Sequence, residues 1–144
     1  MTIYLASDHA GFELKGKIKD FLVKNGYEAE DLGPFAYDAN DDYPELIRPA
    51  AERVSQNPED RAIVLGGSGQ GEAMVSNRYK NVRAAVYYGG NMDIVKLSRE
   101  HNNANVLSFG ARFVKEEEAL EAVKLWLETP FSAEERHHRR VAKI

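Results

Sequence analysis

The chain alternates between short runs rich in apolar residues and longer segments in which apolar residues recur every three or four positions. Short apolar runs are typical of strands that are buried on both faces of a parallel sheet. Five segments read as strands, at residues 3–6, 27–32, 62–65, 82–87 and 106–109, and the second is the least apolar. The segments between them favour helices, since Leu14, Ile18 and Leu22 fall on one helical face.

Turn and capping signals set the expected ends of the helices. Gly26 is placed to end the first helix, and Asp42 is expected to cap a second helix that has Pro44 in its first turn. Ser132, with Glu135 three residues later, is expected to cap a final helix in the tail from 132 to 144. Three more helices are expected, at about 72–77, 92–100 and 120–127.

This order of strands and helices predicts one α/β domain over residues 1–144, with a five-stranded parallel sheet between two layers of helices and a helix at the C-terminus. We find no internal repeat, low-complexity segment or linker. In such sheets, ligands bind outside the carboxyl ends of the strands. Residues that follow a strand are therefore the first candidates for a functional site.

Composition narrows the class of protein. Of the 144 residues, 43% are hydrophobic and 29% charged, and the net charge of −4 does not indicate a nucleic-acid binder. The absence of cysteine excludes disulfides, a thiolate metal site and a cysteine nucleophile, and it fits the cytoplasmic location that we expect. No basic region precedes the N-terminal apolar run, and no apolar stretch reaches about 20 residues, so we expect neither a signal peptide nor a membrane span.

A glycine-rich segment follows the third predicted strand and reads Gly66-Gly67-Ser68-Gly69-Gln70-Gly71. Glycine permits positive φ angles and close approach to main-chain N–H groups, and the next helix adds free N–H groups and its positive dipole end. The segment predicts an anion site, with a plain strand-to-helix turn as the alternative. The segment does not fit a Walker A loop, which needs Lys and then Ser or Thr after its last glycine. It does not fit a dinucleotide-binding loop either, because Glu72 stands at the position of the third glycine.

Glu72 comes directly after this loop. A carboxylate repels a phosphate, so Glu72 is better placed to take a proton from a carbon while the loop N–H groups stabilise the developing enolate oxygen. The alternative is an ordinary acidic residue in the first turn of a helix, where the dipole favours it. The spacing alone leaves both interpretations open.

Polar side chains elsewhere also suit ligand binding. Asp8 and His9 follow the first strand and can hold sugar hydroxyls or a phosphate, although Asp8 also suits a helix N-cap. His101 follows a helix and can move protons on sugar oxygens, or can simply be a surface histidine favoured by the helix C-terminus. Asp38, Asp41 and Asp42 form a small acidic cluster. Because no histidine lies near it in the sequence, loop and capping roles are favoured over a metal site.

Three arginines are candidates for binding a phosphate. Arg112 follows the fifth strand, and Arg136 and Arg140 lie four residues apart on one helical face of the cluster 136–140. The planar guanidinium group suits phosphate oxygens. The alternative for the cluster is a solvated basic face, and a nucleic-acid site would need a larger basic surface with interleaved aromatic residues.

Taken together, the motifs resemble those of ribose-5-phosphate isomerases of type B, in the group that also includes galactose-6-phosphate isomerase subunits. The resemblance covers nearly the whole chain. It rests on Ser7-Asp8-His9-Ala10-Gly11, Asp42-Tyr43-Pro44, Gly66-Gly67-Ser68-Gly69-Gln70-Gly71-Glu72, Arg99-Glu100-His101-Asn102-Asn103, Phe109-Gly110-Ala111-Arg112 and Arg136-His137-His138-Arg139-Arg140, in this order. It implies a Rossmann-like three-layer α/β/α sandwich, no metal or cofactor, and a homodimer or dimer of dimers with active sites between subunits.

The resemblance also implies roles for single residues. His101 would help to open the sugar ring. Many members of the family carry a cysteine base at the position of Gly66, whereas a second branch uses a glutamate just after the loop, so the resemblance favours Glu72 as the base. The residues that would bind the substrate are Asp8, His9, Gly67, Ser68, Gly69, Gln70, Gly71, Asn102, Arg112, Arg136 and Arg140.

The resulting hypothesis is a reversible isomerisation of ribose 5-phosphate and ribulose 5-phosphate, with a small sugar phosphate as the partner and with no nucleic acid or membrane involved. Three alternatives stay open. The substrate can be a six-carbon 6-phosphate or a four-carbon sugar phosphate, the isomerase can depend on a metal, or the protein can bind a sugar phosphate without turnover.

Overall fold

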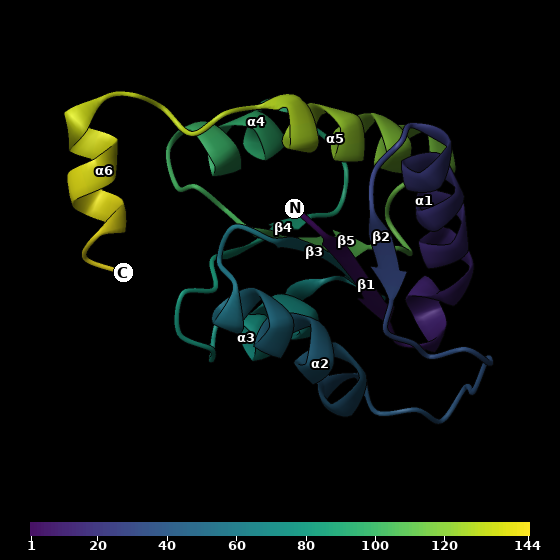
Figure 1. Cartoon of the computed structure of the whole chain (residues 1–144). Coiled ribbons are helices and arrows are strands. Elements are labelled where there is room, and N and C mark those ends of the chain that lie inside the picture. The colour runs from purple at the N-terminus through teal and green to yellow at the C-terminus, as the bar shows by residue number, and fades with distance from the viewer.

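The structure is a computed structural model that describes residues 1–144, and it contains one sheet with helices on both faces (Figure 1). All neighbouring strands are parallel, and their order is β2-β1-β3-β5-β4. The strands are β1 (Ile3–Ser7), β2 (Ala29–Asp31), β3 (Arg61–Gly66), β4 (Ala84–Tyr87) and β5 (Val106–Gly110). The predicted three-layer fold with a five-stranded parallel sheet is confirmed.

Alternation along the strands divides the core into two layers. Ile3 and Leu5 lie in a cluster with Trp126 and other residues of the helices on one face, whereas Tyr4 and Ala6 pack on the opposite face. The first face is covered by α1 (Phe12–Lys24), α4 (Asp93–Glu100) and α5 (Glu116–Glu128), and the second by α2 (Tyr43–Gln56) and α3 (Gln70–Ser76). Successive strand residues point to opposite faces, so a strand buried on both sides reads as a continuous apolar run.

The last helix, α6, spans Glu135–Val141 and stands apart from the sheet, on the side away from the arrowheads of β1 and β2 (Figure 1). The predicted N-cap at Ser132 is wrong, because Glu134 occupies the N-cap position. Ser132 instead lies in the connecting segment, where its N–H donates to the carbonyl oxygen of Glu100 at 3.0 Å. This tertiary bond holds Ser132 outside the helix.

Other element ends differ from the expected ones by a few residues. Strand β2 is shorter than expected, β4 begins at Ala84 rather than at 82, and α3 begins at Gln70 rather than at 72. Asp42 does occupy the N-cap position of α2, but its side chain makes no capping hydrogen bond. None of the helices combines the length and the apolar character that a bilayer crossing requires.

The carboxyl ends and the amino ends of the parallel strands have different roles in this topology. The chain leaves β1 toward β2 and returns to β3 on the other side, so the direction of winding switches between β1 and β3. Ligands of such sheets bind at the carboxyl ends of the strands beside this point. The segment after β1 and the glycine loop after β3 both end there. Residues 101–105, in contrast, lead into the amino end of β5.

Candidate active site

The glycine loop makes a tight turn between β3 and α3. Gly69 has a φ of 77°, and a Cβ there would lie 2.7 Å from the backbone of β5, so the turn requires glycine. The chain beyond β5 fixes the loop, since the N–H groups of Ala111 and Arg112 donate to the carbonyl oxygens of Gly66 and Gly67 at 2.8 and 3.2 Å. The backbone of the loop is therefore held in place from the neighbouring strand.

The start of α3 leaves main-chain donors free. The first backbone bond at this end runs from the N–H of Ala73 to the carbonyl oxygen of Gly69 at 3.1 Å. The N–H groups of Gln70 and Gly71 come before it and donate to no backbone carbonyl, and that of Gln70 has only a long contact of 3.4 Å with Ser68 Oγ. The N–H of Glu72 is engaged by the carboxylate of the same residue. Free N–H groups at a helix start are the donors that an oxyanion needs.

Glu72 lies in the first turn of α3 and is buried, with 4% of its surface exposed. Its carboxylate occupies the space that a side chain at position 66 would fill, because a Cβ built on Gly66 would collide with Glu72 Oε1 and Cδ. Gly66 is therefore the residue that makes room for the carboxylate. For this chain, a cysteine at 66 and the observed position of Glu72 would exclude each other.

Burial raises the pKa of Glu72, and the nearby charge of Asp8 raises it further, while a hydrogen bond with its own backbone N–H acts in the opposite direction. The sequence left open whether burial or the helix dipole determines this pKa. A carboxylate with a raised pKa is a stronger base than an exposed one. The electrostatics of Glu72 thus suit proton transfer.

Asp8 and His9 follow β1 at the same edge. Asp8 is buried, and its Oδ1 accepts from the N–H groups of Ala10 at 2.8 Å and Gly11 at 3.2 Å. It caps the single 3-10 turn η1 (His9–Gly11), so the capping interpretation is confirmed. The capping bonds use only Oδ1 and leave Oδ2 free for a ligand.

His9 contacts a carboxylate that the sequence did not assign to it. Its Nδ1 lies 2.7 Å from Oδ1 of Asp41, 32 residues further along the chain. The expectation that no histidine lies near the acidic cluster is therefore wrong, because the fold brings His9 to Asp41. Asp8, His9 and Asp41 each offer a ligand atom within 4.8 Å of the others, and they form the one group in the chain with metal-ligand spacing. No short sequence pattern connects residues this far apart.

Two more side chains lie against the glycine loop. Arg112 lies over it, with Nη1 3.2 Å from the place of a Cβ on Gly67. Tyr43, at the start of α2, lies against Gly71, where a Cβ would come within 2.7 Å of the ring. Sequence reasoning noted Tyr43 only as part of a motif and gave it no role. The loop is thus flanked by a cation and a phenol.

The other predicted site residues lie elsewhere. His101 is the C-cap residue of α4, and its ring lies 4.2 Å from the ring of His137 in α6. Asn102 follows it and lines a separate hollow with Arg83 and Ala85. None of these residues is at the carboxyl edge, because α4 returns the chain to the amino end of β5 before they occur.

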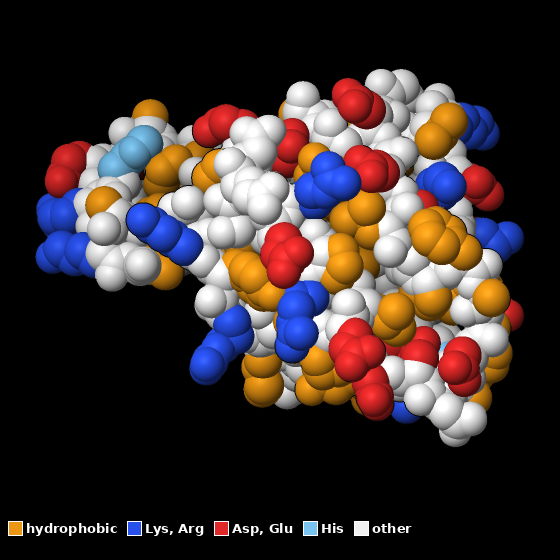
Figure 2. All heavy atoms as spheres, turned by 60° about the horizontal axis from the view of Figure 1, so that its bottom comes forward, with side chains coloured by type: hydrophobic (Ala, Val, Ile, Leu, Met, Phe, Trp, Pro, Cys, Tyr) orange, Lys and Arg blue, Asp and Glu red, His pale blue; other side chains and the backbone are white.

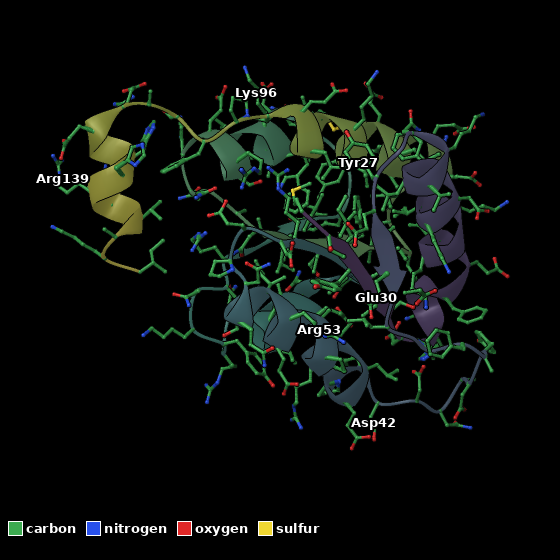
Figure 3. All side chains as sticks on the ribbon, viewed as in Figure 1. Tyr27, Glu30, Asp42, Arg53, Lys96 and Arg139 are labelled. Carbon is green, nitrogen blue, oxygen red and sulfur yellow. The ribbon has the colours of Figure 1, made fainter.

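Arg136 and Arg140 lie on α6, and Arg136 Nε pairs with Glu134 Oε2 at 2.7 Å. Figure 2 shows Lys and Arg side chains gathered at the end of the molecule that α6 forms. Arg139 on this helix lies at the left of the molecule and Asp42 at the start of α2 lies at its bottom, so the two are well apart (Figure 3). One copy of the chain therefore assembles the loop, Glu72, Asp8, His9 and Arg112, and leaves the remaining predicted residues apart.

The fold and the site define a parallel α/β protein with a buried carboxylate and a glycine loop at the switch point of its sheet. The sequence model of the family described as Ribose/Galactose Isomerase matches residues 3–144. The chain belongs to this family.

Named relatives and solved structures agree. Ribose-5-phosphate isomerase B of Mycolicibacterium paratuberculosis is 43% identical over 98% of this chain and 87% of its own length. The crystal structure of ribose-5-phosphate isomerase B from Mycoplasma genitalium with bound ribulose-5-phosphate matches with a TM-score of 0.94 and 38% identity, over 99% of this chain and 92% of that one. The Thermotoga maritima enzyme matches with a TM-score of 0.90 and 39% identity, over 99% and 95%.

Proposed function

We propose that this chain interconverts ribose 5-phosphate and ribulose 5-phosphate through an enediolate. The observation that carries the proposal is the buried carboxylate of Glu72 beside the free N–H groups of the glycine loop. Membership of the isomerase family supports it, as does the relative solved with bound ribulose-5-phosphate.

In the proposed reaction, Glu72 removes the proton from C2 of the open-chain aldose and returns it to C1. The electron pair of the broken C–H bond forms the enediolate, and negative charge develops on the oxygen at C1. Main-chain N–H groups at the start of α3 are fixed before the reaction and lie where they can stabilise this charge. Glu72 both takes and returns the proton bound to carbon, while the hydroxyl proton at C2 moves to the oxygen at C1, so that no net proton is gained or lost.

The ring must open before the proton can be removed, and we assign this step to His101, with Asn102 binding the sugar. Arg112 beside the loop, together with Arg136 and Arg140 on α6, would hold the phosphate. Binding of the distant phosphate positions the reacting carbons and so contributes to turnover. His101 and the α6 arginines lie away from the carboxyl ends of the strands, where Glu72 and the loop are. The complete site of this proposal therefore requires a second copy of the chain.

We therefore propose a homodimer, or a dimer of dimers, with each active site between two chains. The surface beside β4 supports this arrangement. This strand lies at the edge of the sheet, and next to it a hollow is lined by Ala73, Met74, Val86 and Tyr88, among others. Met74 and Tyr88 are 67% and 55% exposed. An exposed apolar surface of this kind suits contact with another protein, here a second copy of the chain.

The test is formation of ribulose 5-phosphate from ribose 5-phosphate by purified protein that has been treated with a chelator. We expect turnover, together with exchange of the C2 proton into deuterated water. Stabilisation by the sugar phosphate without exchange would instead indicate a binding module. Loss of turnover on chelation would indicate a metal-dependent isomerase, and a faster rate with six-carbon or four-carbon phosphates would correct the substrate. The cytoplasmic location remains a prediction.

A further inference from the structure

The pair formed by His9 and Asp41 has no part in the mechanism described so far. His9 lies at the end of β1, and Asp41 lies in the loop that leads into α2. Nδ1 of His9 and Oδ1 of Asp41 are 2.7 Å apart, and the two side chains are only 24% and 10% exposed. A contact this short between an imidazole nitrogen and a carboxylate is a charge-assisted hydrogen bond when the ring is protonated.

The loop holds Asp41 in place for this contact. The N–H of Asp41 donates to the carbonyl oxygen of Asp38 at 3.2 Å, and the side chain of Asp38 accepts from the N–H of Asn40 at 2.9 Å. The second oxygen of Asp41, Oδ2, is buried and has no hydrogen-bond partner. The carboxylate is thus directed at the histidine by a local turn, and no other donor competes for it.

Charged groups face His9 from three elements. Asp8 lies beside it in sequence, Asp41 contacts it from the loop, and Arg112 approaches from beyond β5. The rings of His9 and Tyr37 also lie perpendicular to each other, with centroids 6.1 Å apart. The hydrogen bond to Asp41 has the largest effect and raises the pKa of His9, while burial and Arg112 oppose it. The two carboxylates therefore favour the charged ring despite the neighbouring arginine.

The state of His9 decides what its other nitrogen can do. With Nδ1–H donated to Asp41, a charged ring presents Nε2–H as a donor, whereas a neutral ring presents a bare Nε2 that repels an anion. Beside Arg112, a second cationic donor suits an oxygen of the substrate phosphate.

We infer that Asp41 is a positioning residue, which holds the ring of His9 in one orientation and in its charged form so that Nε2–H binds the substrate phosphate together with Arg112. This role rests on the proposed function, because the phosphate belongs to the proposed substrate. Asp41 itself does not touch the substrate and acts only through His9.

The test compares Asp41→Asn with Asp42→Asn. The first keeps the shape of the side chain and removes its charge, and the second removes the same charge from the neighbouring exposed residue, whose side chain makes no capping bond. For Asp41→Asn we expect KM to rise about tenfold at pH 8 and by a smaller factor at pH 6, where a larger share of the His9 rings is protonated, with kcat changed by less than about twofold. Asp42→Asn should match the parent at both pH values.

A second readout does not depend on turnover. We expect the NMR titration midpoint of the His9 ring, assigned through its loss in His9→Gln, to move to lower pH in Asp41→Asn and to stay in place in Asp42→Asn. The double variant His9→Gln/Asp41→Asn should have the KM of His9→Gln within about twofold, since Asp41 acts through His9.

Three results would overturn the role of Asp41. These are an unmoved midpoint, a loss of kcat without a change in KM, or additive effects in the double variant. If the parent protein lacked isomerase activity, the proposed function would fail, but the midpoint would still report on the pair. The two ideas can therefore fail separately.

Discussion

The carboxyl edge of the sheet and the region around α6 both carry chemical side chains, but they differ in how those side chains are held. At the carboxyl edge, Glu72 and Asp8 are buried, and bonds from the neighbouring strand fix the loop. In α6, Arg136 and Arg139 are more than half exposed, and each pairs with a glutamate of its own segment. The first region is organised by the fold, whereas Arg136 and Arg139 in the second are held by pairs within their own segment.

This difference follows from what each region must do in the proposed reaction. A base and an oxyanion hole need fixed geometry, since a small displacement weakens proton transfer. Arginines that bind the substrate phosphate in the active site of another chain must lie on the surface of their own chain. Pairing between exposed charges contributes little to stability, so exchanging an intrachain glutamate for a substrate phosphate costs little. The comparison thus separates the groups that the proposed reaction uses within one chain from those that it would use across the proposed interface.

The largest expected effect is at the organised edge. Glu72→Gln keeps the size of the side chain and removes the base, and we expect kcat to fall by ~10²–10⁴. The measurement is the rate of ribulose 5-phosphate formation, with C2 proton exchange as a parallel assay. Glu45→Gln, which changes an exposed glutamate in the first turn of α2, is the control and should keep full activity. Near-normal turnover in the Glu72 variant would refute the assignment.

Gly66→Ala tests the space beneath that carboxylate. The added methyl group would displace Glu72, whose carboxylate fills this position, and we expect a loss of kcat/KM of about 10² because misplaced groups react poorly. Gly16→Ala is the matched control, since a Cβ at Gly16 meets nothing within 4 Å. If both variants were equally active, Glu72 would have to act from another position.

A mixing experiment tests whether the α6 region serves a second chain. We expect Glu72→Gln and the double variant Arg136→Ala/Arg140→Ala each to be nearly inactive. After joint denaturation and refolding, hybrid dimers would contain one site with both defects and one with neither, so about a quarter of the parent activity should return. Each variant refolded alone is the control. An absence of recovery would indicate that both regions act within one chain.

The sequence predicted the fold well because buried parallel strands are visible as apolar runs. It also located Glu72 and the glycine loop, since the residues after a strand collect at one edge. It did not predict the contact between His9 and Asp41, because 32 residues of chain separate them. The prediction of an N-cap at Ser132 was wrong although the local sequence pattern favoured it. Ser132 instead makes a tertiary hydrogen bond, from its N–H to the carbonyl oxygen of Glu100.

The raised pKa of Glu72 could not be predicted for the same reason. Its largest cause is burial, and burial depends on the glycine at position 66 and on the packing of α3 against the sheet. The helix dipole, which can be inferred from the sequence, acts in the opposite direction. Only the assembled structure shows which effect is larger.

The smallest expected effect is a shift in pH dependence at the organised edge. A base must be ionised, so kcat/KM should fall about tenfold for each pH unit below the pKa of Glu72 in the free enzyme. Because burial and Asp8 raise this pKa, the fall should begin at a higher pH than for an exposed glutamate. Asp8→Asn removes one of the two causes and should move the acid limb to lower pH, whatever it does to the maximal rate. The same substitution lowers the pKa of His9, which affects the alkaline side, so the two limbs should be fitted separately. An acid limb that stays in place or moves to higher pH would show that Asp8 does not raise the pKa of the base, and the electrostatic account of this edge would have to rest on burial alone.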